Sequence, residues 1–135
     1  MRFSSDLDLD EVERITGAKR PHHSWDPCIS FPNGISYAQL EQLVGIGAAD
    51  MDDAQNDSPS IGDFLRELIP YKDSISFIGY VVYPPRTDTR VSVEGFEAKG
   101  VTAEIGLDLA FRYKADETGY KKNEDGTFDL SFWWD

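Results

Sequence analysis

The chain has 135 residues, and its 25 acidic residues outnumber its 13 Lys and Arg residues, which gives a formal net charge of −12 at pH 7. A surface this acidic repels phosphate and anionic lipid, and it attracts basic proteins with a strength that falls as salt is added. Binding to nucleic acid requires Lys and Arg to neutralise phosphates. The composition therefore argues against nucleic acid and membrane surfaces as partners, and it predicts a protein partner that is basic.

The composition is typical of a folded cytoplasmic protein. Apolar residues make up 40% and aromatic residues 13% of the chain, which is enough to form a hydrophobic core. Cys28 is the single cysteine, so no disulfide can form within the chain, and a reducing compartment fits best. The N-terminal segment turns acidic at once and lacks the apolar stretch of a signal peptide. We expect one cytoplasmic domain that spans residues 1–135.

Signals for the start of a helix stand at three places in the first half of the chain. Asp8 and Ser36 each precede a Glu or Gln by three residues, which is the spacing of a capping box. A third helix is predicted to begin at Ser58 or Ser60 and to end at Pro70, because proline cannot continue a helix. These signals predict three short helices.

The second half of the chain has the composition of β-strands. Residues 75–83 are β-branched or aromatic on both faces, as in a central strand, and a turn leads from them to a partner strand over residues 89–98. Residues 127–134 place large apolar side chains at alternate positions, which predicts the last strand. We therefore expect an antiparallel sheet.

Residues 101–114 fit two structures. Apolar residues occupy every second position, which is typical of a strand. However, Glu104, Asp108 and Arg112 recur every four residues, as on one face of a helix, and Thr102 can cap that helix. The helix is favoured, and the strand would instead give a four-stranded meander. The predicted fold class is α+β: three short N-terminal helices, then an antiparallel sheet of three to four strands with one helix packed on it.

An acidic loop is the strongest candidate for a binding surface. It spans residues 50–57, between the second and third predicted helices, and such a loop is also typical of a solvated linker. Interface hot spots favour Trp and Tyr, and opposite charges steer association, so we expect acidic residues to act together with an aromatic anchor. The predicted partner-binding residues are Asp50, Asp52, Asp53, Asp57, Trp25 and Trp133.

A second cluster holds the side-chain types that bind metals. Two His, one Asp and the only Cys fall within seven residues, and these groups are common ligands of zinc and other transition metals. Because no His pair at helical spacing and no second Cys or His pair completes a four-ligand site, an ordinary loop is favoured. The residues of this alternative site are His22, His23, Asp26 and Cys28. No catalytic or phosphate-binding motif is present, and no cofactor is expected.

The last third of the chain resembles a family. Lys114-Ala115-Asp116-Glu117, followed after a spacer by a final strand that ends in Trp133-Trp134-Asp135, is similar to the ending of small bacterial immunity-type proteins. The chain departs from that pattern at Thr118, where the family has an aromatic residue. The resemblance implies a cytoplasmic protein that neutralises a toxin by binding it and has no catalytic residues. It also fits a helix over residues 102–114.

Two hypotheses follow. The first is a non-enzymatic acidic binding protein, an immunity protein or inhibitor that neutralises a basic partner such as a toxin. The alternative is a small enzyme or a metal- or ligand-binding domain centred on the loop from His22 to Cys28. Metal analysis of the purified protein separates the two hypotheses.

Overall fold

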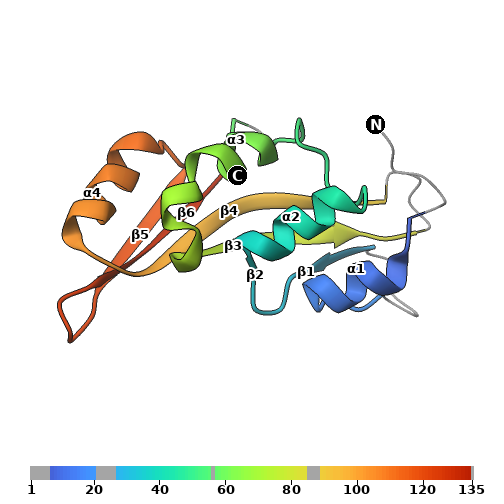
Figure 1. The fold of residues 1–135 in the computed structure, drawn as a ribbon, viewed down its shortest axis with the longest axis horizontal. Coiled ribbons are helices and arrows are strands. Elements are labelled where there is room, and N and C mark those ends of the chain that lie inside the picture. The colour runs from blue at the N-terminus through green and yellow to red at the C-terminus, as the bar shows by residue number, and fades with distance from the viewer. Residues whose placement is uncertain (1–6, 21–26, 56, 85–88, 135) are drawn as a thin grey trace.

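The computed structural model describes residues 7–20, 27–55, 57–84 and 89–134. Most helices lie in the first half of these residues and the long strands lie in the second half (Figure 1). The helices are α1 (Leu9–Thr16), α2 (Tyr37–Gly45), α3 (Ile61–Glu67), the short 3-10 helix η1 (Ile69–Ser74) and α4 (Ala103–Arg112). The strands are β1 (Cys28–Ser30), β2 (Ile35–Ser36), β3 (Ile75–Val82), β4 (Arg90–Val101), β5 (Glu117–Lys122) and β6 (Phe128–Trp133).

All strands belong to one antiparallel sheet, so the predicted α+β class is confirmed. The strand order is β1-β3-β4-β6-β5, and β2 pairs with β3 beside β1. The prediction of three to four strands is wrong, because the sheet has six strands among the described residues. The predicted hairpin corresponds to β3 and β4, and the predicted last strand corresponds to β6.

The strands that the sequence did not predict are short or polar. β1 has three residues and β2 has two, so neither is long enough to show an alternating pattern. Every residue of β5 is exposed, and its sequence is charged at both ends with Gly119 inside. β5 forms because β6 offers it a full row of backbone partners, from Glu117 opposite Trp133 to Lys122 opposite Phe128. Pairing in the sheet here outweighs the weak intrinsic preference of the segment.

The helix starts follow the predicted capping signals. The Asp8 carboxylate accepts hydrogen bonds from the backbone N–H groups of Asp10 and Glu11, and Ser36 forms a complete capping box with Gln39. Glu11 does not complete the first box, because its carboxylate pairs with Arg14 at 2.6 Å. Ser60 caps α3 in the same way as Ser36 caps α2.

Residues 103–112 form the helix α4, so the helical interpretation is confirmed and the four-stranded meander is wrong. The side chain of Thr102 caps α4 by accepting a hydrogen bond from the N–H of Ile105. Successive alternate residues of a helix lie about 200° apart around its axis. The alternating apolar pattern therefore divides between two sides: Leu109 is fully buried, whereas Leu107 is 72% exposed and Phe111 is 81% exposed.

The helices pack on one face of the sheet and leave the other face less covered. The ring of Phe64 on α3 lies 5.8 Å from that of Phe77 and 5.6 Å from that of Phe96, which are both fully buried. The opposite face of β3, which carries Ile78 and Tyr80, is only partly buried. We call this second side the uncovered face. Figure 1 shows α2 crossing in front of β3, and α4 at the end of the sheet formed by β5 and β6.

Within the described ranges, no helix combines the length and the apolar character needed to cross a bilayer.

Candidate functional site

A β-bulge on β4 shapes the uncovered face. Ile78 pairs with Gly95, and the next residue, Gly79, pairs with Val93, so Glu94 is an extra residue on β4. A bulge breaks the alternation of side chains along its strand. As a result Glu94 and Glu97 both face the uncovered side, although an uninterrupted strand would place them on opposite faces.

The bulge requires glycine on both strands. A Cβ atom on Gly79 would lie 2.0 Å from the carbonyl oxygen of Ser92, and one on Gly95 would lie 2.1 Å from the carbonyl oxygen of Phe132. Both distances are far below van der Waals contact, so the backbones approach closely because neither residue has a side chain. The two glycines therefore fix the position of Glu94.

A hollow of about 390 Å³ lies next to the bulge, and the half-buried Trp133 forms part of its wall. Trp133 stands opposite Gly95 on β4 and opposite Glu117 on β5. The hollow is lined by residues of the four neighbouring strands β3, β4, β6 and β5. The residues that line the hollow are Ile78, Glu94, Glu97, Glu117, Thr118, Gly119, Ser131 and Trp133.

Three of the residues that line the hollow are glutamates: Glu94, Glu97 and Glu117. Lys99 Nζ lies 3.8 Å from Glu97 Oε1, and no ion pair joins Glu94 or Glu117 to another of the described residues. Carboxylates beside an indole suit a guanidinium or ammonium group. Such a group gains a cation–π contact of about 0.5–1 kcal/mol and exposed ion pairs of about 0.2–1 kcal/mol each.

The acidic residues of the predicted loop differ in their surroundings: Asp50 forms hydrogen bonds within the loop, and others are exposed to solvent. Asp50 Oδ1 accepts a hydrogen bond from the N–H of Asp52 at 2.9 Å, and the Asp50 carbonyl accepts one from the N–H of Asp53 at 3.0 Å. Asp50 therefore holds a tight turn. Asp52 and Asp57 are exposed, and Asp57 lines a groove that also contains Arg112 and Lys114.

Asp53 is the partly buried member of the loop. Burial is the main cause that raises the pKa of its carboxyl group, the charge of Asp50 adds to this effect, and Arg90 opposes it. Its Oδ2 atom is buried without a hydrogen-bond partner among the described residues. The loop acids are thus not equivalent, and Asp53 is a poor candidate for direct contact with a partner.

The acidic loop adjoins the hollow through Gln55. Its Oε1 atom accepts hydrogen bonds from the Tyr80 hydroxyl at 3.4 Å and from Ser92 Oγ at 3.2 Å. Tyr80 and Ser92 are paired across β3 and β4, two residues from Ile78 and Glu94 respectively. The loop and the hollow therefore border the same face of the sheet.

The alternative metal or catalytic site cannot be placed as a whole. His22, His23 and Asp26 lie outside the described residues, as does Trp25, the other predicted aromatic anchor. Cys28 begins β1, where it is partly buried opposite Val82. Across the ranges that the structure describes, no group of three or more His, Cys, Asp or Glu side chains could hold a metal ion.

The sequence predicted Trp133 but not the glutamates around it. Glu94 and Glu97 lie within the strand predicted over residues 89–98, and no helix or strand was predicted around Glu117. The available signal was Gly95 inside a strand, which often marks a bulge or a close backbone approach. A comparison with protein-family models, curated proteins and solved structures found no match to this chain.

Proposed function

We propose that the protein is a non-enzymatic binding protein that neutralises a basic protein partner, in the manner of a small bacterial immunity protein or inhibitor. The observation that carries the proposal is the hollow on the uncovered face, where Trp133 lies among Glu94, Glu97 and Glu117. An aromatic side chain with acidic neighbours fits an Arg or Lys side chain of a partner. The resemblance of the chain's ending to immunity-type proteins supports the same function.

The charge of the whole chain favours such a partner in a second way. A net charge of −12 attracts a basic protein from a distance and raises the association rate, more strongly at low salt. The exposed acids Asp52 and Asp57 lie in the loop that borders the hollow face. We assign them to this long-range attraction, and we assign Trp133 and the glutamates to the contact itself.

Capture from a native lysate at low salt tests the proposal. The bait proteins are the natural chain, the hollow variant Glu94→Gln/Glu97→Gln, and the control variant Glu41→Gln/Asp73→Asn, which loses the same charge at exposed positions on α2 and η1. We expect the natural chain and the control to retain a basic protein that salt releases. The hollow variant should lose it.

Rates of association with the captured protein and of dissociation from it distinguish residues that contact the partner from residues that attract it over a distance. Asp52→Asn/Asp57→Asn should slow association with little change in dissociation, because charges outside the contact act mainly on the encounter. The hollow variant should dissociate about tenfold faster or more. The proposal is wrong if the hollow variant and the control retain the partner equally, or if the captured protein is acidic.

A further inference from the structure

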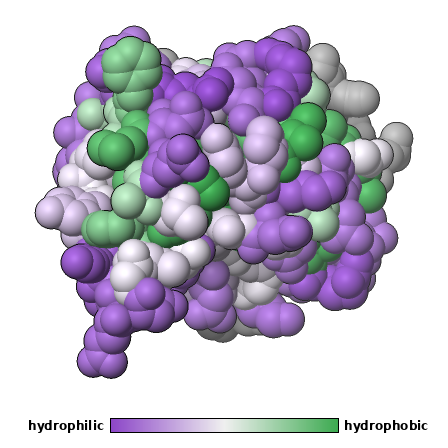
Figure 2. All heavy atoms as spheres, turned by 60° about the vertical axis from the view of Figure 1, so that its left-hand side comes forward, coloured by the Kyte–Doolittle hydropathy of each residue, from purple (hydrophilic) through white to green (hydrophobic). Residues whose placement is uncertain are grey.

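The end of the molecule that carries α4 exposes apolar surface. Leu107 and Phe111 of α4 are 72% and 81% exposed, and Tyr120 of β5 is 75% exposed. In Figure 2, where this end comes forward, apolar residues lie among hydrophilic ones on the left of the view. Isolated exposed apolar residues need no explanation, but a group of them with a groove marks a docking surface.

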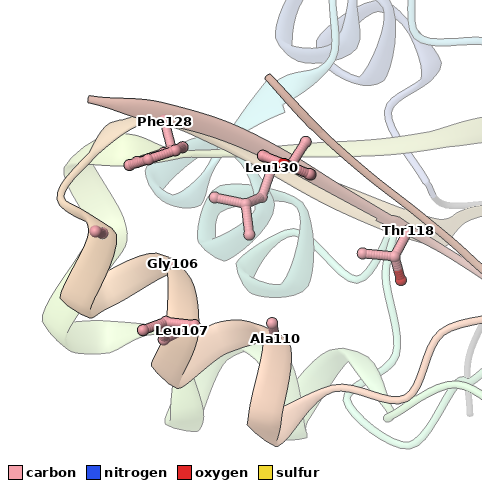
Figure 3. A pocket seen from close by; sticks show the side chains of 8 residues that line it. Gly106, Leu107, Ala110, Thr118, Phe128 and Leu130 are labelled. Carbon is pink, nitrogen blue, oxygen red and sulfur yellow. The ribbon is translucent and has the colours of Figure 1, made fainter. Parts of the chain in front are cut away.

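A groove of about 390 Å³ runs between α4 and the outer strands. Figure 3 shows its two walls, with Gly106, Leu107 and Ala110 on α4 and with Thr118, Phe128 and Leu130 on the strands. α4 packs closely on β6, where a Cβ atom on Gly106 would lie 3.3 Å from Leu130 Cδ1. β5 lies beyond this contact, and all its residues are exposed.

β5 is also the last strand of the sheet, with β6 as its neighbour on one side. Its other edge presents backbone N–H and C=O groups that can pair with another strand. A long exposed edge beside apolar side chains invites association with a further chain. The sequence of the edge then determines which chain fits.

Along this edge, acidic residues precede Gly119 and basic residues follow it. The sequence is Asp116-Glu117-Thr118-Gly119-Tyr120-Lys121-Lys122, with two acids before the central three residues and two bases after them. An antiparallel copy of the same strand reverses this order. The segment is therefore complementary in charge to itself when it runs antiparallel and is centred on Gly119.

Side-chain direction is compatible with the same register. When two identical strands pair about a twofold axis perpendicular to the sheet, opposing residues must point to the same face. Pairing Gly119 with the partner's Gly119 satisfies this condition. It sets Glu117 opposite the partner's Lys121 and sets Asp116 opposite the partner's Lys122. A shift of two residues places Lys122 opposite the partner's Thr118 and removes these charge pairs.

We propose that the chain forms a twofold homodimer in which the β5 strands pair antiparallel about Gly119 and extend the sheet across both copies. In this register Thr118, which lines the groove, stands opposite the partner's Tyr120. The tyrosine then covers apolar surface that the single chain exposes. The proposal concerns a second copy of this chain. Of the four charged positions that it pairs, Glu117 also lines the hollow proposed for the basic partner, whereas Asp116, Lys121 and Lys122 do not.

Two charge-reversal variants test the dimer. Asp116→Lys/Glu117→Lys makes both ends of the β5 segment basic, and Lys121→Glu/Lys122→Glu makes both ends acidic. Opposite charges across strands stabilise pairing and like charges destabilise it. We expect each variant alone to dimerise about 100-fold more weakly than the natural chain, and an equimolar mixture of the two to form a heterodimer. All four positions are exposed.

Sedimentation equilibrium measures all four samples at low and high salt. The expected results are a dimer for the natural chain, monomers for each variant alone, and a heterodimer that salt weakens for the mixture. Formation of the heterodimer also demonstrates that both variants are folded. A natural chain that stays monomeric, variants that dimerise as well as the natural chain, or a mixture of folded variants that stays monomeric would each overturn the proposal.

Discussion

The hydroxyl of Tyr113 donates a hydrogen bond of 2.9 Å to Glu67 Oε1, which ties the end of α4 to the end of α3. Tyr113 follows α4 directly, and its ring packs edge-on against Phe96 at 5.1 Å between centroids. Burial and the bond to Glu67 both raise the pKa of Tyr113, so the hydroxyl stays protonated and remains a donor. One side chain thereby holds two helices on the same face of the sheet.

Tyr113→Phe isolates this hydrogen bond, because the ring and its aromatic contacts remain. We expect the free energy of unfolding to fall by about 1–2 kcal/mol, since a bond to a charged, partly buried group is lost. Urea unfolding measures the change. Tyr71→Phe is the matched control: it removes the bond of 2.7 Å from Tyr71 to Asp108, and Tyr71 is only partly buried, whereas Tyr113 is 4% exposed. A loss from Tyr71→Phe as large as that from Tyr113→Phe would contradict this interpretation.

Gly95→Ala tests the bulge. The added methyl group would lie 2.1 Å from the Phe132 carbonyl oxygen, so the strands must separate. We expect a loss of stability of about 3 kcal/mol, measured by thermal or urea unfolding. Gly45→Ala, at an exposed position of α2 with no atom within 4 Å of the new Cβ, should instead stabilise the protein by about 0.5–1 kcal/mol. Similar effects at both positions would show that the bulge does not depend on Gly95.

Asp53→Asn tests the cost of the partly buried carboxylate. Because the pKa of Asp53 is raised in the folded protein, folding binds a proton, and stability falls as the pH rises from the ordinary carboxyl range through the raised pKa. We expect the variant to be more stable than the natural chain at pH 7 by about 0.5–1 kcal/mol, allowing for partial exposure. The difference in stability between the variant and the natural chain should disappear at acidic pH, where Asp53 is protonated in both the folded and the unfolded protein.

Urea unfolding at a series of pH values measures this effect. Asp52→Asn, at the exposed neighbouring position, serves as the control and should change stability less. If the Asp53→Asn variant is less stable than the natural chain at pH 7, the Asp53 carboxylate makes a favourable interaction in the folded protein.

The sequence predicted those features that depend on local chemistry. Asp8, Ser36 and Thr102 cap helices as expected, because a cap depends on residues three or four positions away. Local signals of the same kind, the cap at Thr102 and the four-residue spacing of Glu104, Asp108 and Arg112, distinguished the helix α4 from a strand. The exposure of Leu107 and Phe111 follows from the alternating pattern once the segment is helical.

The features that depend on pairing between distant strands were not predictable. β5 has no hydrophobic pattern of its own, and β6 determines where it lies. The bulge turns Glu94 to the uncovered face, and the register brings Glu117 opposite Trp133. For this reason the sequence predicted Trp133 as an anchor together with the acids of the 50–57 loop, and it did not predict that Glu94, Glu97 and Glu117 line one hollow with Trp133.

The most direct test of the proposed binding face is NMR mapping with an arginine-rich peptide at low salt, using ¹⁵N-labelled protein. We predict that the largest chemical-shift changes occur at the Trp133 indole and at the backbone of Gly119 and Ser131. These changes should shrink in Glu94→Gln/Glu97→Gln but not in Glu41→Gln/Asp73→Asn. Largest changes in the 50–57 loop or on the helical side, with the Trp133 indole unmoved, would contradict the account.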